Sequence, residues 1–157
     1  MLKNVSMVNN VATNAGGAIN NSSPDDVRVS NSLIVGNEAI FGSVCGFVMH
    51  SDGHNLFDDL TDCTITGETT SNIIEQDFFL YSLQENNQLT LSHTPDINSA
   101  AIDNGSCDLS ADQRGVARPQ GNGCDIGAVE FEASDEIDQP PPPAPDLSYI
   151  FLPMVQR

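Results

Sequence analysis

The sequence predicts an all-β protein built from short, stacked strands. Its 157 residues are rich in Asn, Ser, Thr, Asp and Gly, and no long window carries the i, i+3, i+4 apolar pattern of an amphipathic helix. Hydrophobic residues make up 39% of the chain and aromatic residues 6%, with no Trp, so we expect a core of small aliphatic side chains. An internal repeat favours a β-solenoid over other all-β folds.

The repeat lies in the N-terminal third. Residues 2–12 (LKNVSMVNNVA) align with residues 29–39 (VSNSLIVGNEA) at an offset of 27, with four identities and two further apolar matches. Repeats of roughly 20–50 residues are typical of solenoids, and short strands broken by Asn or Gly favour strands over helices as the repeated unit. The alternative is a chance match in an Asn-rich chain. We expect a third coil over residues 46–56 and place partial coils over residues 1–100.

Stacked coils would bring equivalent Asn residues together at the corners. The alignment places Asn4 over Asn31 and Asn10 over Asn37, and we expect each pair to form a hydrogen-bonded ladder. Asn also tolerates the left-handed backbone of a sharp corner. Because repeat proteins need about three stacked units, we expect the sequence to be the C-terminal part of a longer chain whose earlier coils precede Met1.

The four cysteines form two local pairs, Cys45 with Cys63 and Cys107 with Cys124. Neither pair has CxxC spacing or a His at metal-ligand distance, which disfavours zinc. Disulfides closing loops of this length contribute about 3 kcal/mol each and belong to oxidising compartments. Buried free thiols are the alternative. We therefore expect two structural disulfides and an extracellular or cell-surface protein whose signal peptide precedes the sequence.

Residues 101–131 form a candidate cap for the open end of the solenoid, which would otherwise expose unpaired strand edges. We expect Asp112, Arg114, Arg118 and Glu130 to form ion pairs that hold the cap loops together. The functional alternative is a sugar-binding Arg flanked by acids.

Four blocks follow one another in the C-terminal half: residues 86–93, 98–105, 112–119 and 124–130. In this order they resemble the C-terminal region of bacterial choice-of-anchor Q surface proteins, which are large, secreted and adhesin-like. The residues depart from the family pattern at 86–89, which lack its Gly-Gly-Pro, and at Ala100, where the family has Pro. The resemblance implies the C-terminal end of a right-handed parallel β-helix with an irregular disulfide-linked cap, and it brings no catalytic residues.

The tail has two parts. Residues 132–146 are acidic and then Pro-rich, which predicts a disordered, solvated linker. Residues 147–157 are apolar but too short to cross about 30 Å of hydrocarbon. We expect a short sorting or attachment tail, the alternative being a frayed end or a strand that docks back on the solenoid.

The charge limits the classes of partner. The formal net charge is −17, from 22 acids against 5 Lys and Arg, which disfavours nucleic acid and anionic membrane surfaces. No oligomer is evident, and we expect no cofactor. A surface polysaccharide or a protein ligand remains as the expected partner.

No catalytic constellation stands out. Polygalacturonase-like hydrolases of this fold need paired acids, a Gly-His-Gly step and an Arg-x-Lys anchor; Asp25-Asp26 and Gly53-His54-Asn55 match the first two loosely, and the third is missing. The three histidines, His50, His54 and His93, lack a convincing partner.

The acidic loop with Asp58, Asp59 and Asp62 holds either a cation or only solvent.

Because no catalytic constellation stands out, we expect a non-enzymatic, adhesin-like or structural surface protein. The alternatives are the end of a carbohydrate-active enzyme whose catalytic coils lie upstream, and a cytoplasmic protein of unknown role.

Overall fold

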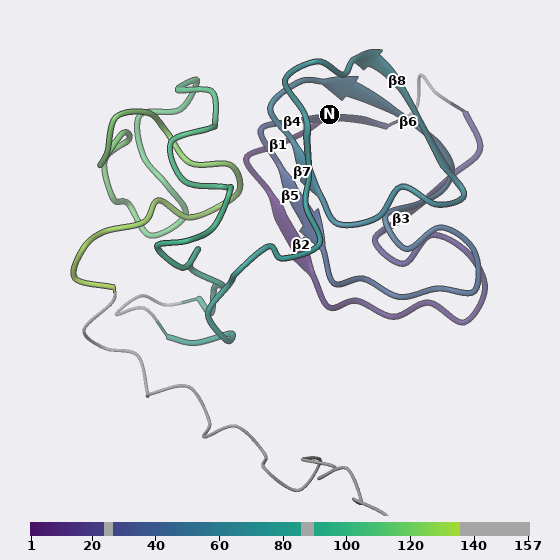
Figure 1. The fold of residues 1–157 in the computed structure, drawn as a ribbon, viewed down its shortest axis with the longest axis horizontal. Helices are drawn as coiled ribbons and strands as arrows, with labels where there is room; N and C mark the ends of the chain where they lie inside the picture. The colour runs from purple at the N-terminus through teal and green to yellow at the C-terminus, as the bar shows by residue number, and fades with distance from the viewer. Residues whose placement is uncertain (24–26, 86–89, 136–157) are drawn as a thin grey trace, which may run out of the picture.

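The computed structural model describes residues 1–23, 27–85 and 90–135, and its strands form two parallel sheets (Figure 1). No residue in these ranges is helical, so the expectation of an all-strand chain is confirmed for them. The strands are β1 (Leu2–Lys3), β2 (Ser6–Val8), β3 (Ile19–Asn21), β4 (Arg28–Ser30), β5 (Leu33–Val35), β6 (Cys45–Asp52), β7 (Leu56–Phe57), β8 (Cys63–Glu68) and β9 (Ile73–Ile74).

One sheet has five strands in the order β1-β4-β6-β3, with β8 also pairing with β6, and the other has four in the order β2-β5-β7-β9. The pairing between the first strands follows the internal repeat. Leu2 lies beside Val29 and Ser6 beside Leu33, each 27 residues further along. The two segments that the alignment equates therefore lie side by side as parallel strands.

The prediction of a right-handed parallel β-helix is wrong. The strands belong to two separate parallel sheets, and no clear right-handed solenoid is formed. The reason is that the spacing between paired strands changes along the four-stranded sheet. Ser6 pairs with Leu33 after 27 residues, a bond links Ser32 to Asn55 after 23, and another links Asn55 to Asn72 after 17. Stacked coils of constant length cannot be built from turns that shrink in this way.

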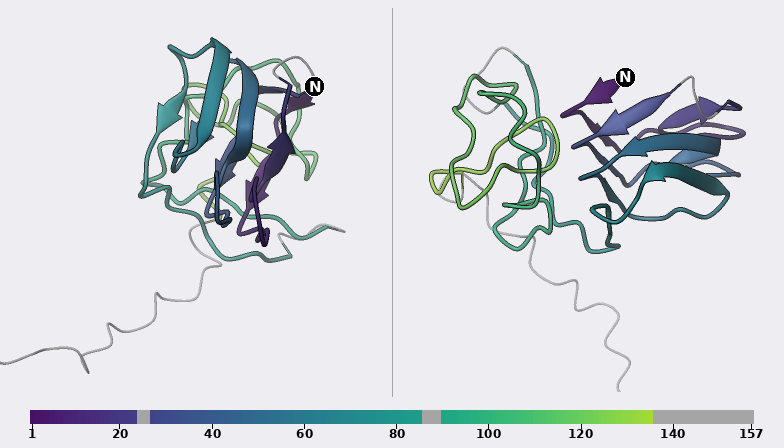
Figure 2. Two further views of the ribbon diagram at one scale, coloured as in Figure 1. Left: turned by 90° about the vertical axis from the view of Figure 1, so that its right-hand side faces the viewer. Right: turned by 90° about the horizontal axis from the view of Figure 1, so that it is seen from above.

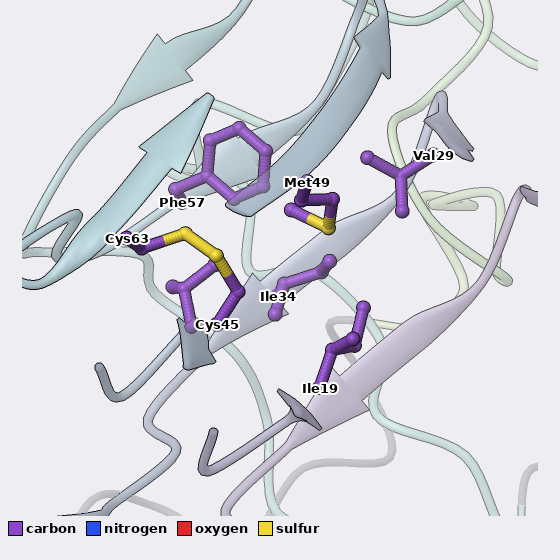
Figure 3. Close-up of a cluster of buried hydrophobic side chains, with 8 residues drawn as sticks. Ile19, Val29, Ile34, Cys45, Met49, Phe57 and Cys63 are labelled. Atoms are coloured by element: carbon purple, nitrogen blue, oxygen red, sulfur yellow. A yellow bond between two sulfur atoms is a disulfide. The ribbon is translucent and has the colours of Figure 1, made fainter. Parts of the chain in front are cut away.

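The inner core lies between the two sheets. Apolar side chains from both sheets meet there, among them Met49 of β6, Ile34 of β5 and Phe57 of β7 (Figure 3). The Cys45–Cys63 disulfide joins β6 to β8 at the edge of this cluster. The inner core consists of Ile19, Val29, Ile34, Val44, Cys45, Met49, Phe57 and Cys63.

An outer core lies on the other face of the four-stranded sheet. Leu33, Val35 and Leu56 point away from the inner core and pack against Ala101 and Ile126. Successive side chains of a strand point to opposite faces, so β5 and β7 contribute to both cores. This sheet is therefore covered on both faces.

Residues 101–131, the C-terminal module, do not cover an end of the strand stack as predicted. They lie along the outer face of the four-stranded sheet, where the green-to-yellow chain runs behind the strands in the left view of Figure 2 and to one side of them in the right view. The Gly127 N–H donates to the Asn31 carbonyl at 3.0 Å, and the Ala128 N–H donates to Ser6 Oγ at 3.0 Å. The module thus covers the face of the sheet. The predicted linker beyond residue 135 and the attachment tail at 147–157 lie outside the described residues.

Candidate functional site

A groove on the loop side of the sheets is lined by two exposed phenylalanines. The loops that join β2 to β3 and β5 to β6 project away from the C-terminal module (Figure 1). Phe41 and Phe47 line the groove there and are 55% and 61% exposed. The cavity encloses about 440 Å³, within the range of small-ligand sites, which is roughly 300–1,000 Å³. The residues of this aromatic groove are Asn14, Ala15, Phe41, Gly46, Phe47 and Asp62.

The backbone places Phe41 directly beside Asn14 and Ala15 of the neighbouring turn. Ala15 and Phe41 form a parallel bridge, and the Phe41 N–H donates to the Asn14 carbonyl at 3.0 Å. Gly46 lies so close to this turn that an added Cβ would be 2.8 Å from the Gly16 nitrogen and 3.1 Å from the Ala15 Cβ. Only glycine permits this approach without a shift, so Gly46 lets the two backbones lie close together at the groove.

Phe47 is held in an unusual backbone conformation. Its φ is 99°, in a region that side-chain-bearing residues rarely adopt, and Asp62 beside it has φ 59°. Strand β6 pairs Phe47 with Asn21 on one side and with Cys63 on the other, and the Cys45–Cys63 disulfide closes this corner. Strained residues of this kind persist only where neighbours determine them, and they cluster at functional sites. A bulky apolar side chain is thereby kept in solvent instead of in the core.

The groove is negatively charged. Asp62 lines it, and no Lys or Arg does. Each of the four Lys and Arg residues in the described ranges is already paired with an acid elsewhere. The pairs are Lys3–Asp108, Arg28–Asp52, Arg114–Asp112 and Arg118–Glu130.

The acidic loop beside the groove is organised by its own side chains. Asp58 Oδ2 accepts the Gly36 N–H at 2.6 Å, and Asp59 Oδ1 accepts the Thr61 N–H at 2.8 Å. Within the part of the chain that the structure describes, no group of three or more His, Cys, Asp or Glu is arranged to hold a metal ion. Asp58 and Asp59 thus shape the turn that carries Asp62 into the groove.

The C-terminal module contains the ion pairs expected between its Arg and acidic residues. Arg118 Nη1 lies 2.6 Å from Glu130 Oε2, with both side chains excluded from solvent, and Arg114 Nε lies 3.0 Å from Asp112 Oδ2. Arg114 also meets Asp135 at 3.1 Å. These guanidinium groups bind partners within residues 112–135, and their burial leaves neither of them facing a ligand as the sugar-binding alternative requires.

Asp125 is a buried acid of the same module that the sequence did not single out. Its Oδ1 accepts the Asp103 N–H at 2.9 Å, and its Oδ2 accepts the Phe131 N–H at 2.5 Å. Burial raises the pKa of this carboxyl to about 6, with a further contribution from the charge of Glu130, and outweighs the two N–H bonds, which lower it. Asp125 therefore joins the start of the module to its end.

The predicted corner ladders are only partly formed. Asn10 Nδ2 donates to Asn37 Oδ1 at 2.8 Å, as the alignment implies. Asn4 and Asn31 both have positive φ, but their side chains do not bond to each other. Asn31 instead donates to the Asp125 carbonyl at 3.2 Å and accepts the Ser106 N–H, because the C-terminal module occupies its side of the corner.

A second polar ladder was missed. Asn55 is fully buried, accepts the Ser32 N–H at 3.0 Å, and donates to Ser51 Oγ and to Asn72 Oδ1 at 3.0 and 3.1 Å. Its members lie 23 and 17 residues apart, so a search at the offset of 27 does not find them. The repeated Ser or Asn before each Leu or Ile of the four-stranded sheet is the signal that the sequence held.

The histidines do not assemble a nucleophile with a base. His50 Nδ1 lies 3.4 Å from Thr66 Oγ1, and its Nε2 lies 3.6 Å from Asp52 Oδ1. Asp52 is already paired with Arg28, and both His distances are at or beyond the outer limit for a hydrogen bond. His54 and His93 each bind a backbone carbonyl through Nδ1. The loosely matching Asp25 and Asp26 lie outside the described residues.

Both cysteine pairs are disulfide-bonded, as predicted: Cys45 with Cys63 and Cys107 with Cys124. Disulfides of this kind are those of a protein that folds in an oxidising, extracellular-type environment. A search of the described ranges finds no helix with the length and apolarity needed to cross a membrane.

Comparisons with protein families, curated proteins and solved structures find no match for this chain. The site therefore has to be interpreted from its own geometry.

Proposed function

We propose that this chain is a non-enzymatic binding protein of the adhesin-like kind, displayed outside a bacterial cell, and that the aromatic groove is its binding site. The observation that carries the proposal is the exposure of Phe41 and Phe47 at one groove, with Phe47 held at φ 99°. Exposed aromatic side chains on a rigid frame are the usual anchors of binding sites, because they bury a large area at little entropic cost.

The location outside the cell is supported by the disulfides, by the family resemblance and by the charge of the chain. The two disulfides indicate an oxidising compartment. The blocks at 86–93, 98–105, 112–119 and 124–130 resemble the C-terminal region of choice-of-anchor Q surface proteins, and we include membership of that group in the proposal. A net charge of −17 suits a protein that must stay soluble and separate from its neighbours at a surface.

The proposal of no catalytic activity is supported by how the acids of the C-terminal module are used. The carboxylates of Asp112, Asp125 and Glu130 bind Arg side chains or backbone N–H groups of the module itself. General acid–base catalysis requires a carboxyl that reaches a substrate.

The test compares the wild-type protein with a Phe41→Ala, Phe47→Ala double variant on a microarray. The array carries neutral, amino and uronic-acid oligosaccharides together with basic, acidic and neutral synthetic peptides. Phe79→Ala is the matched control, because Phe79 is 50% exposed and lies outside the groove.

We expect at least one ligand class to bind the wild type and the control and to be lost from the double variant. Retention of every bound ligand by the double variant would refute the groove as the binding site. Absence of any bound ligand would refute the binding function.

A further inference from the structure

The aromatic groove combines aromatic faces with one carboxylate. Phe41 and Phe47 supply rings whose faces carry partial negative charge, and Asp62 supplies a full negative charge. Asn14 adds an amide that is able to accept a hydrogen bond. Apart from the amide donors of Asn14, the polar and aromatic side chains of this groove offer a ligand negative charge or a hydrogen-bond acceptor.

The charge of the whole chain acts in the same direction. The chain has 22 acids and 5 Lys and Arg, and the four cations in the described ranges are already paired with acids away from the groove. Asp59, exposed and three residues before Asp62, adds to the negative potential at the rim. A field of this sign attracts cations and repels polyanions such as uronic-acid polymers.

Two ring faces near a carboxylate form the kind of site that holds an ammonium group. A cation within about 6 Å of an aromatic centroid gains roughly 0.5–2 kcal/mol, and a neighbouring carboxylate adds Coulomb attraction. A neutral glycan would use the rings but would gain nothing from the surplus of negative charge. A flexible segment with several Lys residues uses both, because one side chain enters the groove while the others remain in the field.

We infer that the aromatic groove binds a basic segment of a partner protein, with a Lys ammonium group held between the faces of Phe41 and Phe47 and the carboxylate of Asp62. This inference rests on the proposed binding function and names its ligand class. The other candidate ligands, an amino-sugar polymer and a neutral glycan, are outcomes of the test below.

The experiment measures the affinity of the 157-residue, disulfide-intact chain for a fluorescein-labelled oligolysine peptide at low and at physiological salt. Phe47→Leu keeps an apolar side chain but removes the ring, and Phe47→Ala removes both. Asp62→Asn removes the groove carboxylate. Asp77→Asn is the matched control, since Asp77 is exposed, lies outside the groove and gives the same change in net charge.

We expect Phe47→Leu and Phe47→Ala to weaken oligolysine binding by about tenfold, equal to about 1.4 kcal/mol. Asp62→Asn should weaken it by about threefold to tenfold, and Asp77→Asn by less than about twofold, because exposed charges far from the bound cation are screened. Circular dichroism and the melting temperature check that each variant folds. If Phe47→Leu binds as the wild type does, or if Asp77→Asn loses as much as Asp62→Asn, the attraction is only that of a polyanion and the inference is overturned.

Competition with a chitosan oligosaccharide and with a cellulose oligosaccharide separates the remaining ligand classes. Displacement of oligolysine by chitosan at a lower concentration than free oligolysine requires would overturn the protein partner in favour of an amino sugar. If binding of a microarray ligand depends on Phe41 and Phe47 but binding of oligolysine does not, the proposed binding function stands and the proposed basic ligand is refuted. If neither the microarray ligands nor oligolysine depends on Phe41 and Phe47, the binding function of the groove and its proposed ligand class are both refuted.

Discussion

The buried pair of Arg118 and Glu130 is the strongest test of how the C-terminal module is held together. Arg118 Nη1 lies 2.6 Å from Glu130 Oε2 and 2.9 Å from the Asp125 carbonyl, and Nη2 lies 2.7 Å from the Gly127 carbonyl. The Glu130 side chain is 1% exposed and that of Arg118 0%. Glu130→Gln removes the only charge that compensates the guanidinium within this cluster of three acceptors.

Breaking a buried ion pair by removing one partner costs about 3–5 kcal/mol, because the other charge is left buried and uncompensated. We therefore expect Glu130→Gln to lower the free energy of unfolding by about 3–5 kcal/mol, a large share of the roughly 5–15 kcal/mol typical of a folded domain. The expected drop in melting temperature is about 10 °C.

Urea denaturation without reductant, followed by circular dichroism, measures this free energy. Glu132→Gln is the control, because its carboxylate is 35% exposed and 3.9 Å from Arg114, and its loss should cost less than about 1 kcal/mol. An Arg118→Met, Glu130→Leu double variant removes both charges and should be more stable than Glu130→Gln alone. A Glu130→Gln variant whose free energy of unfolding lies within about 1 kcal/mol of the wild-type value would show that solvent reaches the pair and would refute its role as a buried ion pair.

Three further predictions concern other parts of the fold. Replacing Cys45 and Cys63 by Ala opens a loop with a sequence separation of 18 and should lower the unfolding free energy by about 3 kcal/mol in denaturant melts, with weaker ligand binding at the groove beside it. Because the pKa of Asp125 is raised to about 6 in the folded protein, its contribution to stability is present below its ordinary pKa of 3.8 and is lost as the pH rises through 6. The stability of wild type relative to Asp125→Asn should therefore fall by about 2–2.5 kcal/mol between pH 4 and pH 7, and a pH-independent difference would contradict the assignment. Asn55→Ala leaves the Ser32 N–H without its acceptor in the core and should cost about 1–3 kcal/mol in the same melts, whereas Asn10→Ala at the exposed ladder should cost less than about 1 kcal/mol.

The parts of the fold that follow from local pattern were accessible from the sequence. The pairing of Leu2 with Val29 follows from the repeat at offset 27, and the pairing of each cysteine with its neighbour follows from their grouping along the chain. The pairing of Arg118 with Glu130 follows from their charge and from their place in one loop-rich segment.

The rest depends on contacts between segments that no local pattern specifies. The constant repeat is not kept because successive turns shorten, and the Ser or Asn before each paired Leu or Ile marks the spacing of the strands but not which residues each shorter turn lacks. The C-terminal module lies on the face of the sheet because Leu33 and Val35 point outward as strongly apolar side chains, a feature that a one-sided solenoid wall does not predict.

The groove was missed for a similar reason. Phe41 and Ala15 meet in a bridge between two turns that are far apart in the sequence. Phe47 faces solvent because of its positive φ, which its residue type does not predict. From the sequence alone, a large apolar residue such as Phe47 is ordinarily expected in the core.

Because the four-stranded sheet is buried on both faces, we expect the strands and the C-terminal module to unfold as one cooperative unit. Ala101 and Ile126 cover the outward side chains of β5 and β7. Detaching the C-terminal module would therefore expose Leu33, Val35 and Leu56 to solvent. During synthesis the outer apolar face of this sheet stays exposed to solvent until residues near Val129 have left the ribosome. A fragment that stops at residue 100 should therefore aggregate, and hydrogen exchange should give amides in β5 and in the module the same free energy of opening.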